Sequence, residues 1–418
     1  MISDKVPMFR KLELARKAVA PFLSPKTTKL AVVFGSVPST DWLDAVISAL
    51  VVAKYRLPKY TSKKKDEPPT LDVEIGVGST ELSPFKAKAE MAEALAQGTN
   101  LVRRLAVMAG NDLTTESYVK EAMALGKASG LTSEFLSYDK LKAMGAGAFC
   151  AVAQASTGTP GILKLHYRPK APRAAIALVG KGITYDTGGA QLKSGEHMFG
   201  MNGDMGGSAV ALALAIYFAK VKSPFSVTAY LAIADNQLSP HSYRPNDVVT
   251  SLIGKTIEVI DTDAEGRMVL ADALTLASRG EKNVVPQLVI DFATLTGSCV
   301  RAIGTRLSGG YSNHKPLLTQ IRKAGEWSGE RVWPFPNHAD YGRCLKSSVA
   351  DLKQCREKGG VDHIEASFFL RQFIENKVPY VHVDLSACEN DGGLGHVPTK
   401  VTGFGVRFGA ELVRRQLG

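Results

Sequence analysis

The chain has 418 residues, of which 45% are hydrophobic and 22% are charged, a composition ordinary for a soluble globular protein. Its longest strongly apolar stretch, which begins at Ala209, is far shorter than the roughly 20 residues that span a bilayer, so no membrane association is expected. The net charge of +11 makes nucleic acid a candidate partner. The basic residues are not interleaved with aromatic ones, however, so nucleic-acid binding stays the minor alternative. A chain of this length predicts two domains.

The N-terminus and the cysteines indicate an intracellular protein. The first 22 residues lack the apolar segment of a secretory signal and include Asp4 and Glu13, so they predict an amphipathic helix. The basic residues from Arg10 to Lys17 leave an organellar leader as a minor alternative. Five cysteines are scattered without CxxC spacing, which is typical of reduced thiols, and we expect a cytoplasmic location.

Residues 1–92 predict a small N-terminal α/β domain. Apolar runs with the length and composition of strands alternate here with a helical run. The expected elements are strands at 29–35 and 70–78, a helix at 41–55 and a basic surface loop at 61–70. From Lys86 a long helical pattern follows, which we expect to connect this domain to the rest of the chain.

Residues 93–418 predict a larger, doubly wound α/β domain with a mainly parallel central sheet. Runs of Val, Ile, Leu and Ala alternate with helical segments, and such continuous runs are typical of strands that are buried on both faces. The expected strands are at 174–184, 226–235, 256–263, 286–297 and 380–387.

Unusual polar residues stand at the ends of these apolar runs. They are Lys181, Asp235, Asp263, Asp291 with Thr294, and Asp384. In open α/β sheets ligands bind outside the carboxyl ends of the strands, so we expect the chemistry of this protein at that edge.

The segment DTDAEGR, residues 261–267, places three acids and an arginine between a strand-like run and a helical run. Either the acids hold a cation, or they form a solvated turn that caps the following helix. An EF-hand calcium loop is a further alternative, since acids and a glycine fall at its ligand positions. It is disfavoured because the preceding segment is strand-like and the last position, Asp272, is not the usual glutamate.

A second stretch, residues 179–209, is rich in glycine, which lets the backbone approach a ligand closely. Its notable charged residues are Lys181, Asp186, Lys193 and Asp204. Taken singly, they fit a surface lysine, a turn residue or a helix cap. A phosphate-binding P-loop is disfavoured because the pattern GxxxxGK[ST] is absent.

Together the two stretches supply four carboxylates, without an HExxH motif. These are Asp186, Asp204, Asp263 and Glu265. An oxygen-rich set suits Mg, Mn or Zn, and its members would repel one another without cations. Two divalent ions about 3.5–4 Å apart would relieve that repulsion and activate a water molecule. Lys193 and Arg267 would remain as positive groups for a developing oxyanion and a second anion, which predicts a hydrolase.

The motifs VGKGITYDTGG, GDMGGSA, DTDAEGR and DFATLTG, in this order and spacing, resemble the leucyl (cytosol) aminopeptidase family of dinuclear metallopeptidases. The similarity covers residues 95–418 and continues through AGEWSGERVWPFP, KSSVADLK and TGFGVRF. Membership implies a small N-terminal domain, a larger catalytic domain and usually a homohexamer that acts on peptides. It also implies two divalent metal ions per subunit, Zn or Mn with Mg or Co as alternatives. Their ligands would be Lys181, Asp186, Asp204, Asp263 and Glu265, with Asp186 and Glu265 shared by both ions.

The resemblance also implies a mechanism, in which a metal-bridging hydroxide attacks the first peptide bond and releases N-terminal residues, preferably leucine and other apolar ones. Lys193 would stabilise the oxyanion, and Arg267 would anchor a bicarbonate ion or a water molecule that acts as general base. The side chain of the first substrate residue would be bound by Met201, Thr294, Leu295, Gly297 and Ser386.

Two departures from the family pattern change the charge near the expected site. Asp261 stands where Asn is usual and adds a negative charge, whereas Asn202 replaces a usual Lys or Arg and removes a positive one. The N-terminal domain is also shorter than usual. Two alternatives remain: a nucleic-acid-binding assembly on the same fold, and an inactive structural relative, which the intact metal and catalytic set disfavours.

Overall fold

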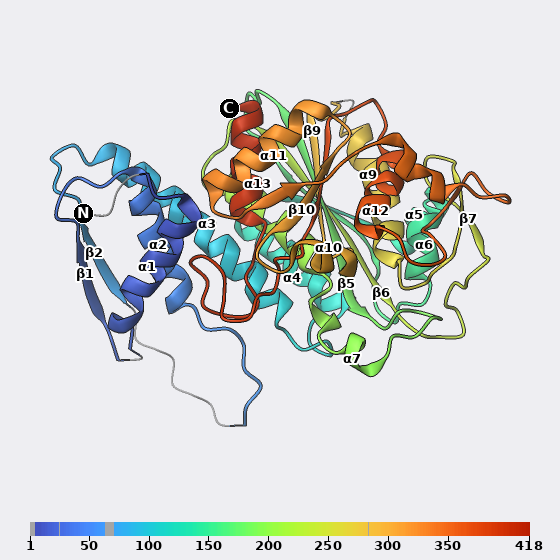
Figure 1. Cartoon of the computed structure of the whole chain (residues 1–418), viewed down its shortest axis with the longest axis horizontal. Helices are drawn as coiled ribbons and strands as arrows, with labels where there is room; N and C mark the ends of the chain where they lie inside the picture. The colour runs from blue at the N-terminus through green and yellow to red at the C-terminus, as the bar shows by residue number, and fades with distance from the viewer. Residues whose placement is uncertain (1–4, 25, 63–70, 283) are drawn as a thin grey trace.

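The structure is a computed structural model that describes residues 5–24, 26–62, 71–282 and 284–418. Figure 1 shows a small N-terminal unit beside a much larger α/β body, in agreement with the two-part fold expected from the sequence. The basic loop expected at 61–70 lies almost wholly outside the described residues. Within the described parts of the chain, no helix is long and apolar enough to cross a membrane.

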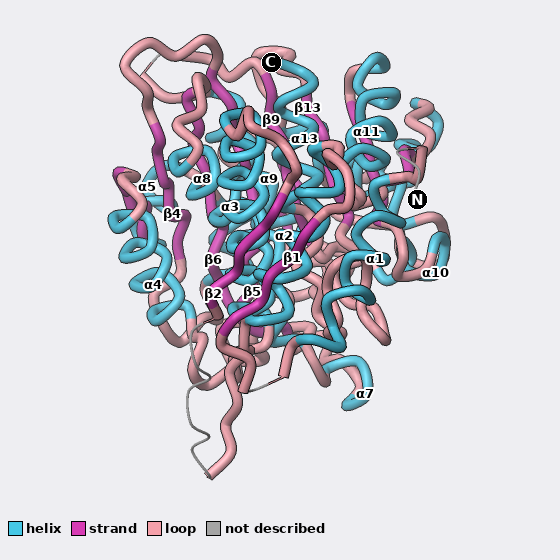
Figure 2. The backbone as a smooth tube through the Cα atoms, turned by 90° about the vertical axis from the view of Figure 1, so that its left-hand side faces the viewer, coloured by secondary structure: helices cyan, strands magenta, loops and turns pink. Residues whose placement is uncertain are grey.

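The N-terminal unit is a two-stranded parallel sheet with two helices packed on one face. Its elements are α1 (Met8–Val19), the short 3₁₀ helix η1 (Ala20–Phe22), β1 (Lys29–Val33), α2 (Thr40–Lys54) and β2 (Asp72–Gly76). Leu30 and Val32 point toward the helices, whereas Val33 is 76% exposed on the opposite face. In Figure 2 this outer face of β1 and β2 is turned toward the viewer. The elements lie within two residues of their predicted positions.

The body is built on an eight-stranded sheet with the order β11-β10-β13-β9-β5-β6-β4-β3. Its central strands β13, β9, β5 and β6 are parallel, whereas β10 is antiparallel to β13, and β4 is antiparallel to β6 and β3. The sheet therefore confirms the mainly parallel arrangement. The strands are β3 (Thr132–Ser137), β4 (Gly161–Tyr167), β5 (Ala175–Asp186), β6 (Ser226–Asn236), β9 (Leu288–Ala293), β10 (Ser308–Ser312), β11 (Val332–Pro334) and β13 (Tyr380–Asp384).

Helices cover both faces of this sheet, as a doubly wound fold requires. Along β5, Ile176 and Leu178 enter the core under one helical layer, and Ala177 and Val179 enter the core under the other, because successive side chains of a strand point to opposite faces. The first layer consists of α3 (Ser83–Ala106), α4 (Thr115–Ala128), α8 (Gly206–Lys220), α11 (Lys315–Ser328) and α13 (Val406–Leu417). The second layer consists of α5 (Tyr138–Met144), α6 (Gly147–Ala153), α9 (Glu265–Arg279) and α12 (Asp362–Leu370).

Two glycines let α8 lie directly against the sheet. A Cβ atom on Gly207 would stand 2.0 Å from the carbonyl oxygen of Phe292, and one on Gly180 would stand 2.3 Å from Cα of Ser208. Neither separation leaves room for a side chain. The N-terminus of α8 is thereby held against β5 and β9, which fixes Asp204, two residues before the helix, at the edge of the sheet.

The predicted strand at 256–263 is largely wrong, because only Thr256–Glu258 is a strand. The chain leaves the ladder there, since the amides of Ile260 and Asp261 donate to Oε1 of Gln354 at 3.2 and 3.1 Å. The first four residues of the DTDAEGR segment consequently form a turn, and its last three begin α9. The strand that remains belongs to a separate three-stranded sheet of β7 (Val248–Thr250), β8 (Thr256–Glu258) and β12 (Leu352–Lys353).

The N-terminal unit and the body are joined through α3, which packs against both α2 and α8. The boundary predicted between residues 92 and 93 falls inside this helix and stays a prediction. Arg407 of α13 also reaches α2, where it forms a buried ion pair with Asp44.

Candidate metal centre

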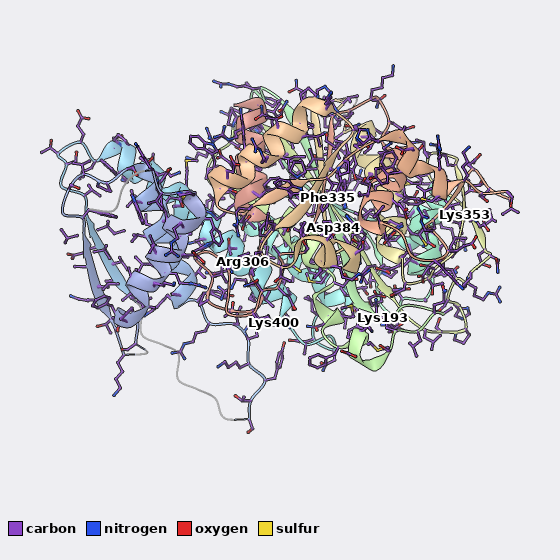
Figure 3. The ribbon with its side chains drawn as sticks, viewed as in Figure 1. Lys193, Arg306, Phe335, Lys353, Asp384 and Lys400 are labelled. Carbon is purple, nitrogen blue, oxygen red and sulfur yellow. The ribbon has the colours of Figure 1, made fainter. Side chains whose placement is uncertain are left out.

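A cavity of about 1040 Å³ opens where the parallel strands end, as the positions of the polar residues predict. Figure 3 labels Lys193 and Lys400 along the lower rim of the body, where both line this cavity. All twelve residues that the sequence analysis assigned to metal binding, catalysis or substrate binding contribute to its wall. Short elements complete it: α7 (Gly195–Met198), η2 (Met201–Gly203) and α10 (Gly297–Ile303).

Three carboxylates form the centre of the site. Asp186, Asp263 and Glu265 each offer an oxygen atom, and these atoms lie within 4.8 Å of one another. Asp186 is the last residue of β5, and its Oδ1 accepts hydrogen bonds from the side-chain amide of Asn236 and the backbone N–H of Gly188, both at 2.8 Å. The carboxylate is thus held in place by donors that do not belong to the metal set.

Lys181 links this group to the fourth carboxylate. Its Nζ lies 2.8 Å from Oε1 of Glu265 and 2.7 Å from Oδ2 of Asp204. Thr294 donates to Oδ1 of Asp204 at 2.6 Å and orients it. Lys181 lies inside β5 and not at its end, because the strand continues beyond it to Asp186.

Lys193 makes the corresponding bridge on the other side of the cluster. Its Nζ is 2.9 Å from Oδ2 of Asp186 and 2.5 Å from Oδ1 of Asp263. The backbone N–H of Lys193 donates to the carbonyl of Thr187, so the glycine-rich turn that ends β5 brings the lysine back over the strand end. Two ammonium groups are therefore shared among four carboxylates.

The cluster has more negative charge than these lysines offset. Burial, assisted by the nearby Asp186 carboxylate, raises the pKa of Glu265 to about 8. Burial likewise raises the pKa of Asp204 to about 6, although Lys181 opposes the shift. A buried, oxygen-rich group of acids that resists ionisation fits divalent cations, whose charge would lower these pKa values and allow Lys181 to become a neutral ligand. The donor set therefore suits hard or borderline divalent ions.

Arg267 is buried beside this cluster with only 2% of its side chain exposed. Its Nη2 lies 2.8 Å from both carboxylate oxygens of Asp362, and its Nη1 donates to the carbonyl of Gln354 at 3.2 Å. Burial alone would lower the pKa of Arg267, but the Asp362 carboxylate outweighs this effect and the net shift is upward. Asp362 is not among the residues predicted from the sequence, where its one visible signal is that it is an acid at a helix start shortly after two glycines.

The two departures from the family pattern have local structural roles. Oδ1 of Asp261 accepts the backbone N–H of Asp263 at 2.9 Å, which stabilises the turn that carries the Asp263 carboxylate. The side-chain amide of Asn202 donates to the carbonyl of Met108 at 2.8 Å.

Two polar residues expected at the site lie elsewhere. Asp291 is fully buried in the middle of β9, where Tyr380 donates to it at 2.6 Å and His382 lies at 2.8 Å. Asp235 accepts a hydrogen bond from Thr184. Neither residue lines the cavity. Asp384 does line it, and its carboxylate accepts the hydroxyl of Thr296 at 2.6 Å.

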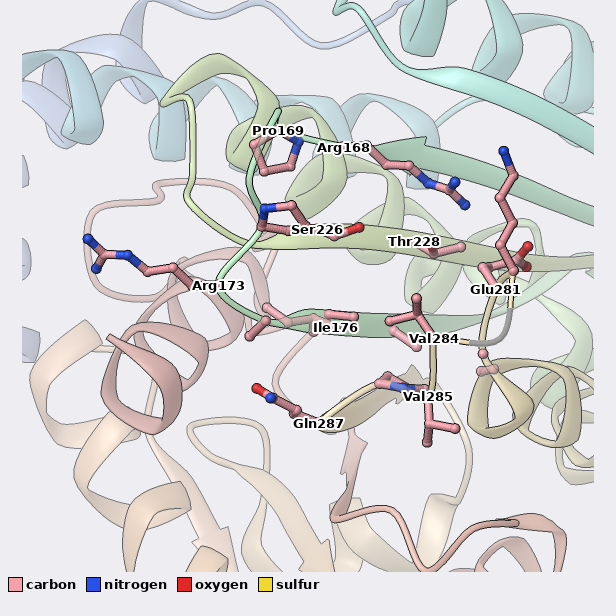
Figure 4. Close-up of a pocket in the computed structure, with 18 of the residues that line it drawn as sticks. Arg168, Pro169, Arg173, Ile176, Ser226, Thr228, Glu281, Val284, Val285 and Gln287 are labelled. Carbon is pink, nitrogen blue, oxygen red and sulfur yellow. The ribbon is translucent and has the colours of Figure 1, made fainter.

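A second cavity, of about 430 Å³, lies at the opposite ends of β5 and β6 (Figure 4). Beside it, Glu134, His166 and Glu281 also bring ligand atoms within 4.8 Å of one another. Lys164 lies 3.3 Å from Glu134 and 2.9 Å from Glu281, and Lys140 lies 2.9 Å from Glu134, so two ammonium groups already balance the two acids. The larger carboxylate cluster is therefore the stronger candidate for the functional site.

A carboxylate and lysine cluster at the carboxyl edge of a doubly wound sheet defines a metal-dependent hydrolase. The model of the cytosol aminopeptidase family, catalytic domain, matches residues 100–409, and the chain belongs to this family. A probable cytosol aminopeptidase of Syntrophotalea carbinolica is 38% identical over 387 residues, which are 91% of this chain and 76% of that protein. The corresponding protein of Gloeobacter violaceus is 36% identical over 387 residues, 90% of this chain and 75% of that protein.

Solved structures agree with this assignment. The bottromycin maturation enzyme BotP in complex with Mn has a TM-score of 0.89 at 32% identity and covers 99% of this chain and 89% of its own. The apo leucyl aminopeptidase from Trypanosoma cruzi has a TM-score of 0.86 at 26% identity and covers 100% of this chain and 80% of its own. The protein is a metal-dependent aminopeptidase, a hydrolase that acts on peptides.

Proposed function

We propose that Lys181, Asp186, Asp204, Asp263 and Glu265 hold two divalent ions, with Asp186 and Glu265 shared. The observation that carries this proposal is the approach of three carboxylates to within 4.8 Å, with Lys181 between Glu265 and the fourth acid. When bound, such ions supply an activated water molecule and polarise the scissile carbonyl. Mn and Zn are the proposed metals, with Mg and Co as alternatives, and a similar enzyme described as a complex with Mn supports the first of them.

In the proposed mechanism Lys193 stabilises the oxyanion. Its side chain is 12% exposed, and its ammonium is held by Asp186 and Asp263, with no other acid paired with it among the described residues. If bound cations balanced the charge of these two carboxylates, the ammonium of Lys193 would be free to face the substrate carbonyl. A preorganised positive group in a site that excludes water stabilises developing negative charge more strongly than solvent does.

The first substrate residue would bind next to the cluster. Thr294 and Leu295 follow β9, Gly297 begins α10, and Met201 and Ser386 complete this part of the cavity wall. The methyl, methylene and thioether groups of these side chains favour leucine and other apolar residues over charged ones. Each methylene group of such a pocket contributes about 1–3 kcal/mol, so the preference is graded and not absolute.

A bicarbonate ion at Arg267, as the family resemblance implies, would have to displace the carboxylate of Asp362 from Nη2. The proposed function therefore needs Arg267 as a buried positive group near the metals, while the identity of its anion depends on Asp362.

We propose a cytoplasmic homohexamer as the working form. Large apolar side chains remain exposed on one edge of the body, with Trp327 at 59% and Trp333 at 50%, and burial between copies would remove them from water. The names of the similar proteins support a cytosolic location. Light scattering tests the assembly, since a hexamer would have six times the chain mass of 44.7 kDa.

The decisive experiment is hydrolysis of leucine p-nitroanilide by metal-stripped protein, before and after addition of Mn or Zn. We expect activity to return with the metal, and Asp263→Asn to lose both activity and bound metal, as measured by elemental analysis. A matched control is Asp139→Asn, which removes one charge from an acid on α5, outside the cavity lining. Metal-independent hydrolysis, or full activity of Asp263→Asn, would overturn the assignment of the site.

A further inference from the structure

We propose that Asp362 is a built-in anion that fills the binding position on Arg267 and closes it to small oxyanions such as bicarbonate and formate. The inference rests on the proposed function only in placing Arg267 beside the reacting groups. It predicts an enzyme that is active without a soluble anion, and a specific variant that acquires an anion site.

The contact itself is close and is made to a deeply buried cation. Nη2 of Arg267 lies 2.8 Å from Oδ1 and 2.8 Å from Oδ2 of Asp362, while the arginine side chain is 2% exposed and that of the aspartate is 36% exposed. Both residues line the metal-site cavity. The carboxylate therefore occupies Nη2 of Arg267 at the cavity wall, where a small anion would otherwise bind.

The remaining donors of Arg267 are not fully used by the protein. Nη1 donates to the Gln354 carbonyl at 3.2 Å, and the buried Nε has no hydrogen-bond partner in the structure. A guanidinium this deeply buried needs an anionic partner, because an unpaired charge away from water is strongly unfavourable. Without Asp362, Nη2 would face the cavity as a preformed donor for an oxyanion.

The chain holds Asp362 ready for this role. It is the first residue of α12, where the helix dipole favours a negative charge. The next residue, His363, donates its backbone N–H to Oγ of Ser298 at 2.8 Å, and its Nδ1 lies 3.0 Å from the same oxygen. Farther along α12, the buried Glu365 is paired with Arg356, whose Nε lies at 2.9 Å.

The backbone before α12 makes this placement feasible. Gly359 and Gly360 have φ values of 64° and 89°, a left-handed conformation that glycine adopts without strain. The chain can therefore turn sharply and present Asp362 at the cavity. Because the carboxylate is ordered during folding, it competes for Arg267 without the entropy loss of a free ion.

Asp362 is also separate from the metal-binding acids. Lys181 is paired with Asp204 and Glu265, and Lys193 with Asp186 and Asp263, whereas no hydrogen bond or ion pair joins Asp362 to any of these residues. Its removal should leave the proposed metal ligands in place. The anion site and the metal site can therefore be tested independently.

The experiment compares the wild-type Zn-loaded protein with Asp362→Ala and, as a matched control, Glu357→Ala. Glu357 lines the same cavity but pairs with Lys353, and no hydrogen bond or ion pair joins it to Arg267. Binding of ¹³C-bicarbonate and ¹³C-formate is followed by NMR line broadening, and hydrolysis is measured in carbonate-depleted buffer with and without each anion. The double variant Asp362→Ala with Arg267→Met identifies the binding group.

We expect no anion binding at Arg267 in the wild type or in Glu357→Ala, and hydrolysis by both that changes less than twofold with bicarbonate. Asp362→Ala should bind either anion in the millimolar range, lose at least tenfold in activity without anion and regain most of it with anion. Binding should disappear in the double variant. Rescue by both anions identifies a site for oxyanions in general, and rescue by bicarbonate alone identifies a carbonate-selective site.

Two results would overturn the proposal: activation of the wild type by bicarbonate to the same degree as the variant, or a folded Asp362→Ala protein that binds neither anion. The isosteric Asp362→Asn variant repeats the test if alanine impairs folding. Because NMR reports binding without turnover, failure of the proposed peptidase activity would leave this part of the test intact.

Discussion

Replacement of Asp44 by alanine should destabilise the protein strongly, because it leaves a buried guanidinium without its carboxylate. Asp44 on α2 and Arg407 on α13 are 4% and 3% exposed. Nη1 and Nη2 of Arg407 lie 2.9 and 3.2 Å from the two carboxylate oxygens, and Nη1 also donates to Ser48 at 3.0 Å. This pair joins the N-terminal unit to the body, and neither of its residues lines the cavity.

Breaking a buried pair by removing one partner costs about 3–5 kcal/mol. The entropy of unfolding is about 2.1 cal/mol/K per residue, so the unfolding free energy of a chain of this size changes by roughly 0.9 kcal/mol per degree near the midpoint of thermal unfolding. The midpoint temperature should therefore fall by about 3–6 °C. Calorimetry or thermal circular dichroism measures the shift. Glu116→Ala is the matched control, since its pair with Lys120 is exposed and its loss should change the midpoint little.

The same pair gives a pH dependence with a definite sign. Burial would raise the pKa of Asp44, but Arg407 and Lys88 outweigh it and hold the pKa well below its usual value of 3.8. A carboxyl group with a lowered folded-state pKa stabilises the protein above pH 3.8, and this stabilisation is lost as pH falls. The difference in stability between the wild type and Asp44→Ala should therefore become smaller below about pH 4. An Asp44→Ala midpoint within one degree of the wild type at pH 7 would refute the reasoning.

Two further predictions concern the body. Gly207→Ala should sharply lower the midpoint of thermal unfolding and reduce metal affinity, because the new Cβ would stand 2.0 Å from the Phe292 carbonyl oxygen and push α8 away from the sheet. A variant with unchanged midpoint and metal affinity would contradict this packing. Burial raises the pKa of Asp272 to about 7, so the folded state binds the proton of this carboxyl group more tightly than the unfolded state does. The stability that the protonated Asp272 contributes should therefore be lost as the pH rises from about 4 to 7. Urea titrations should show this pH slope in the wild type and a smaller one in Asp272→Asn.

The layered body could be predicted from sequence because burial on both faces leaves an unambiguous pattern. Every residue from Ile176 to Thr184 in β5 is buried, and the sequence there is correspondingly apolar. The short strand at 256–258 has no such pattern, because its neighbouring strands β7 and β12 are only three and two residues long. Where a strand is this short, side-chain hydrogen bonds such as those of Gln354 decide its end, and they come from a distant part of the chain.

The candidate metal residues could be predicted because they lie in two short motifs whose composition is unusual for a structural turn. Asp291 shows the limit of that reasoning. It stands in the middle of a parallel strand, but its register partner on β13 is His382, and Tyr380 lies two residues before His382 on the same strand. An acid with such neighbours is satisfied inside the sheet, so strand position alone does not assign it to the cavity.

The Arg267–Asp362 contact is beyond sequence reasoning for a related reason. The two residues are 95 positions apart and belong to different helices, and neither helix pattern requires the pair. What requires it is charge: the motif buries an arginine beside the metal cluster, and a buried cation must have an anion. The motif therefore implies that some anion is present, whereas the fold decides whether the anion is a solute or a side chain. In this chain the turn at Gly359 and Gly360 brings a carboxylate to the position, which makes Asp362 a consequence of topology.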